Sequence, residues 1–218
     1  LEQVIFVLPS YISSIKYHTF YNCESLKKIV IPQSVNTIGN DVFTNCSSLQ
    51  KIEIPSSITT IGDNVFAGCS TLKEITMYSS LCSIGKDSFV KICDLEICGN
   101  IELIHSNLFY KCSQLKHIKL PDSVQIIEQY AFYGCSSLVQ IELSNSLTSI
   151  KNFAFYDCSS LSEIIIPDSV TSIEDNVFEK CSSLNNIKLS SSLEEIGKEA
   201  FKECSSLNNI SIPLSVEF

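Results

Sequence analysis

A phenylalanine recurs along the whole chain at an almost constant interval. The step between neighbours is 23 residues in seven of the eight intervals and 20 residues in the remaining one. The series is Phe20, Phe43, Phe66, Phe89, Phe109, Phe132, Phe155, Phe178 and Phe201. A fixed period in this range indicates a solenoid, in which each repeat forms one coil and neighbouring coils bury each other's apolar side. We therefore expect an elongated stack of coils.

Each phenylalanine has the same apolar neighbours at fixed distances. Isoleucine stands five residues before it every time, and an Ile-x-Ile pair or a close relative follows nine and eleven residues after it, except after Phe89, where the interval is three residues shorter. This alternation has the period of a β-strand with two residues facing inward. All six prolines directly follow such a pair, where a strand can end because proline donates no hydrogen bond. One strand per coil, always in the same direction, predicts a parallel sheet along one wall.

The remaining parts of the repeat are expected to form turns and a second wall. The segment around the phenylalanine is too short for a stable helix and predicts a 3₁₀ or single α turn. The preceding Val/Leu-x-x-Ile segment is predicted to form the opposite wall, as a second short strand. Glycine after the isoleucine suggests a corner with positive φ, although His105, Glu128, Lys151 and Glu174 show that this geometry is not obligatory.

The full pattern, Leu-x-x-Ile-x-Ile-Pro-x-Ser-Val-x-x-Ile-Gly-x-x-Ala/Val-Phe-x-x-Cys, resembles the BspA-like leucine-rich repeats, also called the Treponema pallidum type. The resemblance covers essentially the whole chain. It implies an α/β repeat fold: a right-handed leucine-rich-repeat solenoid, or horseshoe, with a parallel β-sheet on the concave face and short 3₁₀ or α turns and minor strands on the convex side. We expect a single domain over residues 1–218, with about nine 23-residue repeats and an irregular turn at 89–109.

The resemblance also implies roles for particular residues and for the whole protein. The cysteine three residues after the phenylalanine would form a buried structural ladder that bonds the backbone, namely Cys23, Cys46, Cys69, Cys112, Cys135, Cys158, Cys181 and Cys204. Members of the family are surface-exposed or secreted, and some act as adhesins for host matrix proteins or other cells. The resemblance thus implies a cell-surface or secreted antigen that binds a protein ligand. An intracellular scaffold and a structural spacer are the alternatives.

Composition excludes several other classes of function. The net charge is −9, with fifteen lysines and no arginine, which disfavours nucleic acid and anionic membranes as partners. His18, His105 and His117 occupy different places in the repeat, and no nucleophile–base pair or Cys-x-x-Cys motif is present. We therefore expect neither catalysis, nor a metal site, nor a cofactor.

The ends of the sequence suggest a fragment. It begins without methionine part-way through a coil, and neither end shows the polar capping unit that shields a terminal coil. Uncapped ends would permit end-to-end oligomers. No apolar run approaches the ~18 residues of a membrane span, and no signal peptide is visible, so direct membrane insertion of this fragment is not expected.

The cysteines are predicted to be free, buried thiols. Equivalent cysteines of adjacent coils would lie ~4.8 Å apart, but their side chains point the same way, so that bridging them would twist the stack. Cys82 and Cys98 stand at other places in the repeat and are expected to be exposed or reactive. In the shortened coil, either Cys93 is the displaced ladder cysteine or Ile92 replaces the usual leucine. We expect a tolerated deletion there, with a local change of curvature, rather than a hinge or a specialised contact.

The outward positions of the predicted strands form the candidate binding face. They lie eight and ten residues after each phenylalanine, or five and seven after Phe89 because of the three-residue deletion, and change from basic, through acidic, to amide-rich along the chain. Our hypothesis is that a protein partner docks across Glu53 to Ile165. The positions are Lys28, Val30, Lys51, Glu53, Glu74, Thr76, Asp94, Glu96, His117, Lys119, Gln140, Glu142, Glu163, Ile165, Asn186, Lys188, Asn209 and Ser211.

Overall fold

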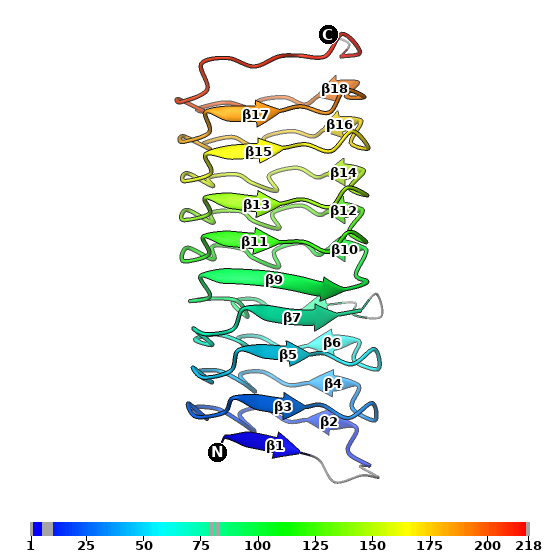
Figure 1. Cartoon of the computed structure of the whole chain (residues 1–218), viewed down its shortest axis with the longest axis vertical. Coiled ribbons are helices and arrows are strands. Elements are labelled where there is room, and N and C mark those ends of the chain that lie inside the picture. Colours follow the sequence, from blue (N-terminus) through cyan, green and yellow to red (C-terminus); the bar gives the residue numbers. More distant parts are fainter. Residues whose placement is uncertain (1, 6–10, 79–80, 82, 217–218) are drawn as a thin grey trace.

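The computed structural model describes residues 2–5, 11–78, 81 and 83–216. Figure 1 shows a column of stacked coils with the two ends of the chain at its opposite ends. Each regular coil contains one longer strand and one two-residue strand. The longer strands are β1 (Gln3–Ile5), β3 (Lys28–Val30), β5 (Lys51–Glu53), β7 (Glu74–Met77), β9 (Asp94–Gly99), β11 (His117–Lys119), β13 (Gln140–Glu142), β15 (Glu163–Ile165) and β17 (Asn186–Lys188).

The two-residue strands form the second wall, as the repeat pattern indicated. Each ends at the isoleucine that stands five residues before the phenylalanine. They are β2 (Ser14–Ile15), β4 (Thr37–Ile38), β6 (Thr60–Ile61), β8 (Ser83–Ile84), β10 (Leu103–Ile104), β12 (Ile126–Ile127), β14 (Ser149–Ile150), β16 (Ser172–Ile173) and β18 (Glu195–Ile196).

All described strand pairs are parallel. The longer strands pair as β1–β3, as a five-stranded sheet from β5 to β13, and as β15–β17. The two-residue strands pair from β2 to β8 and again from β10 to β18. The structure thus confirms a parallel β-solenoid of stacked coils. Right-handed winding and horseshoe curvature stay predictions.

The repeated phenylalanines pack on one another in the centre of the stack. Phe43 and Phe66 stack with ring centroids 5.9 Å apart, and Phe132 and Phe155 with centroids 5.1 Å apart. One cluster of buried apolar residues extends from Ile15 to Val216. Each coil therefore supplies one layer of the core, and no coil can bury its apolar side without a neighbour.

The turn around each phenylalanine is not helical, and the expected 3₁₀ or α turn is wrong for the described residues, which contain no helix. The residues two places before and two places after the phenylalanine have positive φ, as at Tyr130 (61°) and Gly134 (69°). Alternate amides consequently point along the stack. Phe132 N–H donates to Ala154 O of the next coil at 2.8 Å, whereas Tyr133 N–H donates within its own turn to Tyr130 O at 3.1 Å. Carbonyl groups of the neighbouring coil accept hydrogen bonds from backbone N–H groups that a helix would pair within its own turns.

The glycines after the repeated isoleucine serve close packing rather than the positive φ that we expected. Positive φ among described glycines is found only at Gly68, Gly99 and Gly134. A Cβ atom added to Gly62 would lie 2.3 Å from Asn40 Oδ1, which accepts a hydrogen bond from Asp63 N–H at 3.1 Å. Glycine at position 62 therefore leaves room for a side chain that caps the adjacent coil.

The ladder cysteines are unbridged and face backbone carbonyls. In six of the coils the thiol donates to the phenylalanine carbonyl of the preceding coil, for example from Cys158 Sγ to Phe132 O at 3.2 Å. All ten described cysteines are free, whereas Cys82 lies outside the described residues. Burial raises the pKa of the Cys46 thiol to about 12 and that of Cys204 to about 11. These buried thiols are kept neutral.

In the shortened coil between Phe89 and Phe109, Cys93 is not the ladder cysteine and Ile92 does not replace the leucine, so neither alternative left open by the sequence is correct. Ile92, 1% exposed, stands three residues after Phe89, and its N–H donates to Phe89 O as the ladder cysteines do elsewhere. Ile92 therefore takes the place of the ladder cysteine, and Cys93 is only partly buried beside it. The next strand, β9, is six residues long and turns both Leu95 and Ile97 inward.

Candidate functional site: the outward face of the strand wall

The outward side chains of β3 to β17 form a continuous surface, which we call the strand face. The central residue of each three-residue strand is buried and its two neighbours are exposed. Every outward residue from Lys28 to Lys188 lies on a strand as the spacing indicated, whereas Asn209 and Ser211 lie outside any strand. The period-two alternation explains the arrangement, since successive side chains point to opposite sides of a sheet.

A change of register in the middle of the strand face was not predicted. Glu74 of β7 lies opposite Glu96 of β9, although counting across the deletion places it opposite Asp94. On its other side β9 uses its first half, because Asp94 lies opposite His117 and Glu96 opposite Lys119. The shift is two residues, so the inward residues stay inward. In either register Glu74 faces a carboxylate, and like charges directly opposite each other disfavour the pairing of strands.

An ion pair and a histidine–carboxylate contact partly balance the carboxylates at this change of register. Lys119 Nζ lies 3.0 Å from Glu96 Oε1, and His117 Nδ1 lies 2.5 Å from Asp94 Oδ1. The hydrogen bond to Glu96, followed by the charges of Glu96 and Glu142, raises the pKa of Lys119. A shallow groove of about 280 Å³ lies over β9, β11 and β13 and includes these side chains.

Cys98 extends the same outward row, because it lies opposite Thr76. Burial raises its pKa, and the nearby carboxylates of Glu96 and Glu74 raise it further. A thiol reacts as the thiolate. Cys98 is only partly buried, whereas most ladder cysteines are buried, in line with the expectation that it is the more exposed thiol; its reactivity stays a prediction, which the raised pKa does not favour.

A larger groove of about 760 Å³ occupies the beginning of the strand face, over β3, β5 and β7. Val30, Lys28 and Lys51 line it, together with Pro32 and Pro55. Tyr78, at the place that proline usually holds, donates from its hydroxyl to Glu53 Oε1 at 3.0 Å. This hydrogen bond raises the pKa of Tyr78 and holds Glu53 in place. The replacement of proline by tyrosine was visible in the sequence, but its partner was not.

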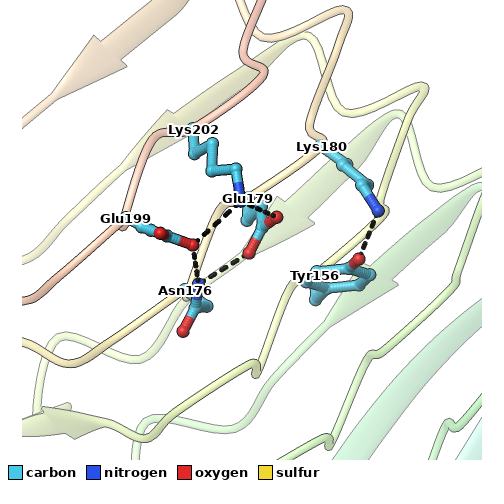
Figure 2. Close-up of polar contacts among 6 residues, drawn as sticks. All are labelled: Tyr156, Asn176, Glu179, Lys180, Glu199 and Lys202. Atoms are coloured by element: carbon cyan, nitrogen blue, oxygen red, sulfur yellow. Dashed lines mark hydrogen bonds and ion pairs between the residues drawn. The ribbon is translucent and has the colours of Figure 1, made fainter.

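A second set of surface groups lies on the turn side of the later coils. Tyr110, Tyr133 and Tyr156 follow their phenylalanines directly and stack on one another, with centroids 5.1 and 4.7 Å apart. Lys180 donates to the Tyr156 hydroxyl. Figure 2 shows this contact beside a network around Glu179, which takes the tyrosine's place one coil later. The constant spacing of the tyrosines could have predicted the stack.

Glu179 in this network is 5% exposed and fully partnered. Lys202 Nζ lies 3.3 Å from Glu179 Oε1, and Asn176 Nδ2 donates to Glu179 Oε2 at 2.6 Å. A buried carboxylate is tolerated only with such partners. The network therefore keeps a buried carboxylate paired where these coils meet.

The histidines do not meet. His18 lies near Asp41, His105 near Glu128 and His117 beside Asp94, on separate coils. Within the part of the chain that the structure describes, no group of three or more His, Cys, Asp or Glu residues could hold a metal ion. The strand face thus offers charges, hydrogen-bonding groups and apolar contacts, which are the means of recognising another macromolecule.

The repeat is matched along nearly the whole chain by one family model. Residues 2–100 and 102–218 match the BspA type leucine rich repeat region. The chain belongs to the BspA-type leucine-rich repeat family. A comparison with curated proteins finds no significant match.

Solved structures of bacterial leucine-rich repeat proteins resemble this BspA-type chain. A leucine-rich repeat protein from Bacteroides ovatus is 31% identical, with 94% of this chain and 72% of that chain covered and a TM-score of 0.43. A leucine rich cell surface protein from Faecalibacterium prausnitzii is 24% identical, with 92% and 76% covered and a TM-score of 0.53. The Treponema pallidum leucine rich repeat protein is 24% identical, with 95% and 78% covered and a TM-score of 0.43.

The likeness to the Faecalibacterium prausnitzii structure concerns the fold alone. Among the described residues, no helix has the length and apolar character that a membrane span requires.

Proposed function

We propose that this BspA-type chain is a non-enzymatic protein-binding module at the cell surface or in secreted form, which mediates adhesion to host proteins or to other cells. The family membership supports a role in interaction, and the Faecalibacterium prausnitzii structure that shares the fold is named a cell surface protein. The binding surface in this proposal is the strand face.

The like-charge pair of Glu74 and Glu96 carries the proposal. These residues lie opposite each other in the middle of the strand face, where the pairing costs stability. Costs of this kind are expected at functional surfaces, because a sequence selected for stability alone would avoid them. Glu142 lies on the far side of Lys119 and adds to the acidic tract.

Charge reversal tests the proposal. The variant carrying Glu74→Lys, Glu96→Lys and Glu142→Lys would be compared with wild type on an array of host extracellular-matrix and cell-surface proteins. The control variant, Glu24→Lys, Glu102→Lys and Glu194→Lys, changes the net charge equally at exposed positions off the strand face. We expect the first variant alone to lose the binding that wild type shows. Equal retention by both variants would refute the role of the strand face.

The cellular location has its own test. Intact source cells are treated with protease, and the repeat region is then detected with an antibody. Loss of the repeat region, with a cytoplasmic marker preserved, is the expected result. Full protection in intact cells together with cleavage in lysed cells would contradict a surface location.

A further inference from the structure

Two exposed aliphatic side chains lie at opposite ends of the acidic tract on the strand face. Val30 on β3 is 53% exposed, and Ile165 on β15 is 65% exposed. The outward residues of β5 to β13 between them are charged or polar, apart from Cys98. The two strands that carry Val30 and Ile165 flank the five-stranded sheet without belonging to it. The surface therefore runs from apolar, through acidic, to apolar.

The separation of the two aliphatic side chains sets the size of a partner. Val30 and Ile165 both stand ten residues after their phenylalanines, six longer strands apart. Strands lie ~4.8 Å apart in a sheet, so the separation along the stack is roughly 29 Å. An α-helix rises 1.5 Å per residue, so about 20 residues of helix span this distance.

The line from Val30 to Ile165 runs across the strands, and this direction favours a helix over an extended segment as the bound part of a partner. The change of register at β9 displaces the row that contains Ile165 from the row that contains Val30 by two residues, ~6.6 Å along the strands. A segment that joins Val30 to Ile165 therefore crosses the strands at a steep, slightly oblique angle, where it meets side chains and no strand edge. An extended segment would bring its own backbone N–H and C=O groups to this face without a ladder to pair them, whereas a helix pairs them internally. The two outward rows lie ~6.6 Å apart along each strand, which suits a helix about 10 Å wide.

Charge complementarity sets the composition of the helix. The outward side chains of β5 to β13 include five carboxylates, at Glu53, Glu74, Asp94, Glu96 and Glu142, against two lysines, at Lys51 and Lys119. Lys119 is already paired with Glu96. A partner that places positive charge close to Glu74 and Glu96 would reduce the electrostatic repulsion between these two carboxylates. Lys28 and Lys51 beside Val30 disfavour positive charge at that end.

We propose that the strand face binds an amphipathic helix of a partner protein that is basic in its middle and carries one apolar side chain near each end, seated on Val30 and on Ile165. The inference rests on the proposed function and adds the chemistry of the partner. The groove lined by Val30 receives one anchor, and the acidic tract orients the helix between the two ends.

Two synthetic helical rulers test this proposal. Both are lactam-cross-linked peptides of about 24 residues with the same composition, a lysine-rich middle and uncharged ends. One carries its two leucines about 18 residues apart, which is five full turns and ~27 Å along one face and close to the separation of Val30 and Ile165, and the other carries them about 11 residues apart on the same face. Fluorescence anisotropy measures the affinity of each for wild type. We expect the long ruler to bind at least about fivefold more tightly, because only it can bury both leucines.

Two conservative variants identify the anchors. Val30→Thr and Ile165→Thr keep a β-branched side chain at exposed strand positions, so their melting temperatures should match wild type. Each should abolish the advantage of the long ruler while leaving the affinity of the short ruler unchanged.

The outcomes separate this inference from the proposed function. Both rulers could bind wild type equally and lose binding to the Glu74→Lys, Glu96→Lys, Glu142→Lys variant. That result would support the acidic strand face as the binding surface and would refute the role of Val30 and Ile165 as anchors. Binding of both rulers that survives this charge reversal would contradict both proposals. No binding of either ruler, with the array binding retained by wild type, would overturn the helix and leave the strand face as the binding surface.

Discussion

The coil step from Phe132 to Phe155 and the step from Phe89 to Phe109 hold neighbouring coils together in different ways. In the first, the rings are nearly parallel, at 3°, Phe132 N–H donates to Ala154 O, and Cys158 donates to Phe132 O. In the second, the rings are tilted by 39°, and among the described residues neither of these two kinds of hydrogen bond crosses the step. The two-residue strands also pair across the first step, as β12–β14, but not across the second, between β8 and β10.

The strand wall holds the shortened coil in place. β9 pairs with β7 along its second half and with β11 along its first half, so the sheet stays continuous where the turn side is interrupted. His105 also crosses this step: its Nε2 lies 3.1 Å from Leu81 O, so Nε2–H donates to the carbonyl. In regular coils a serine makes the equivalent contact, as Ser123 does with Ile101 O. A three-residue deletion is thus tolerated because one wall is lengthened and one hydrogen bond is replaced.

Alkaline pH should show the largest difference between the two kinds of coil, because regular coils contain a buried thiol and the shortened coil contains Ile92 instead. Burial raises the folded-state pKa of Cys46 from 9.0 to about 12. The stabilisation from the neutral thiol is fully present below about pH 9 and is lost as pH rises towards about 12. At about pH 9.5 the ionisation of such a thiol in the unfolded state lowers the free energy of unfolding by an amount on the order of 1 kcal/mol, and the loss grows with the number of ladder thiols whose pKa burial raises.

Urea unfolding at about pH 8 and about pH 9.5 measures this loss. A variant with Cys46→Ala and Cys69→Ala should be less stable at the lower pH but should lose less stability on going to the higher pH. Identical pH dependence in the variant and in wild type would show that the ladder thiols do not cause it.

Removing a central ring should cost more at the regular step than at the shortened one. Phe132→Ala should lower the free energy of unfolding by about 3–5 kcal/mol, since it leaves a cavity between two well-stacked neighbours. Phe89 packs between rings tilted by 28° and 39°. Its surroundings can collapse more easily, so Phe89→Ala should cost about 1 kcal/mol less. Phe153→Ala, on the partly buried turn side, is the control. A wild-type melting temperature for Phe132→Ala would show that the inward assignment is wrong.

Shortening a regular coil tests whether the strand wall alone is sufficient. Deletion of 159–161 reduces the step from Phe155 to Phe178 to the 20 residues found after Phe89. The following strand has no extra length to compensate. Loss of three turn-to-turn backbone hydrogen bonds and one thiol contact should cost roughly 3–4 kcal/mol, at about 1 kcal/mol each, in addition to the loss of the buried Leu161 side chain. Leu161→Ala keeps the length, removes the same buried side chain and serves as the control. Equal unfolding midpoints for the deletion and this control would show that any coil tolerates shortening.

The repeat predicts the inward residues because they must be apolar at fixed spacing, and the strand positions follow from the same alternation. The positive φ values on either side of each phenylalanine were not predicted, although ten of the eighteen residues there are Asn, Asp or Gly, which adopt that conformation most readily. Others, such as Tyr130, Phe153 and Glu199, give no sign of it. The conformation with positive φ is stabilised because backbone N–H groups turned towards the neighbouring coil donate hydrogen bonds to its carbonyl groups.

The site was predictable in its positions but not in its register. Counting across the deletion pairs Glu74 with Asp94, but a shift of two residues leaves the same side chains inward and is therefore invisible to the hydrophobic pattern. The place of Ile92 has a similar cause, because isoleucine and cysteine both fit a buried apolar position. Only contacts between coils distinguish these possibilities.

The smallest expected effect concerns the hydrogen bond that replaces serine at the shortened step. Leu81 is 5% exposed, so loss of the donor from His105 should leave a buried carbonyl unpaired. His105→Ala should lower the free energy of unfolding by about 1 kcal/mol, and Ser123→Ala at the regular step by about the same amount. His105→Gln retains an amide donor and should recover part of the loss. If His105→Ala is neutral while Ser123→Ala is not, the strand wall alone holds the shortened coil, and the histidine only fills its corner.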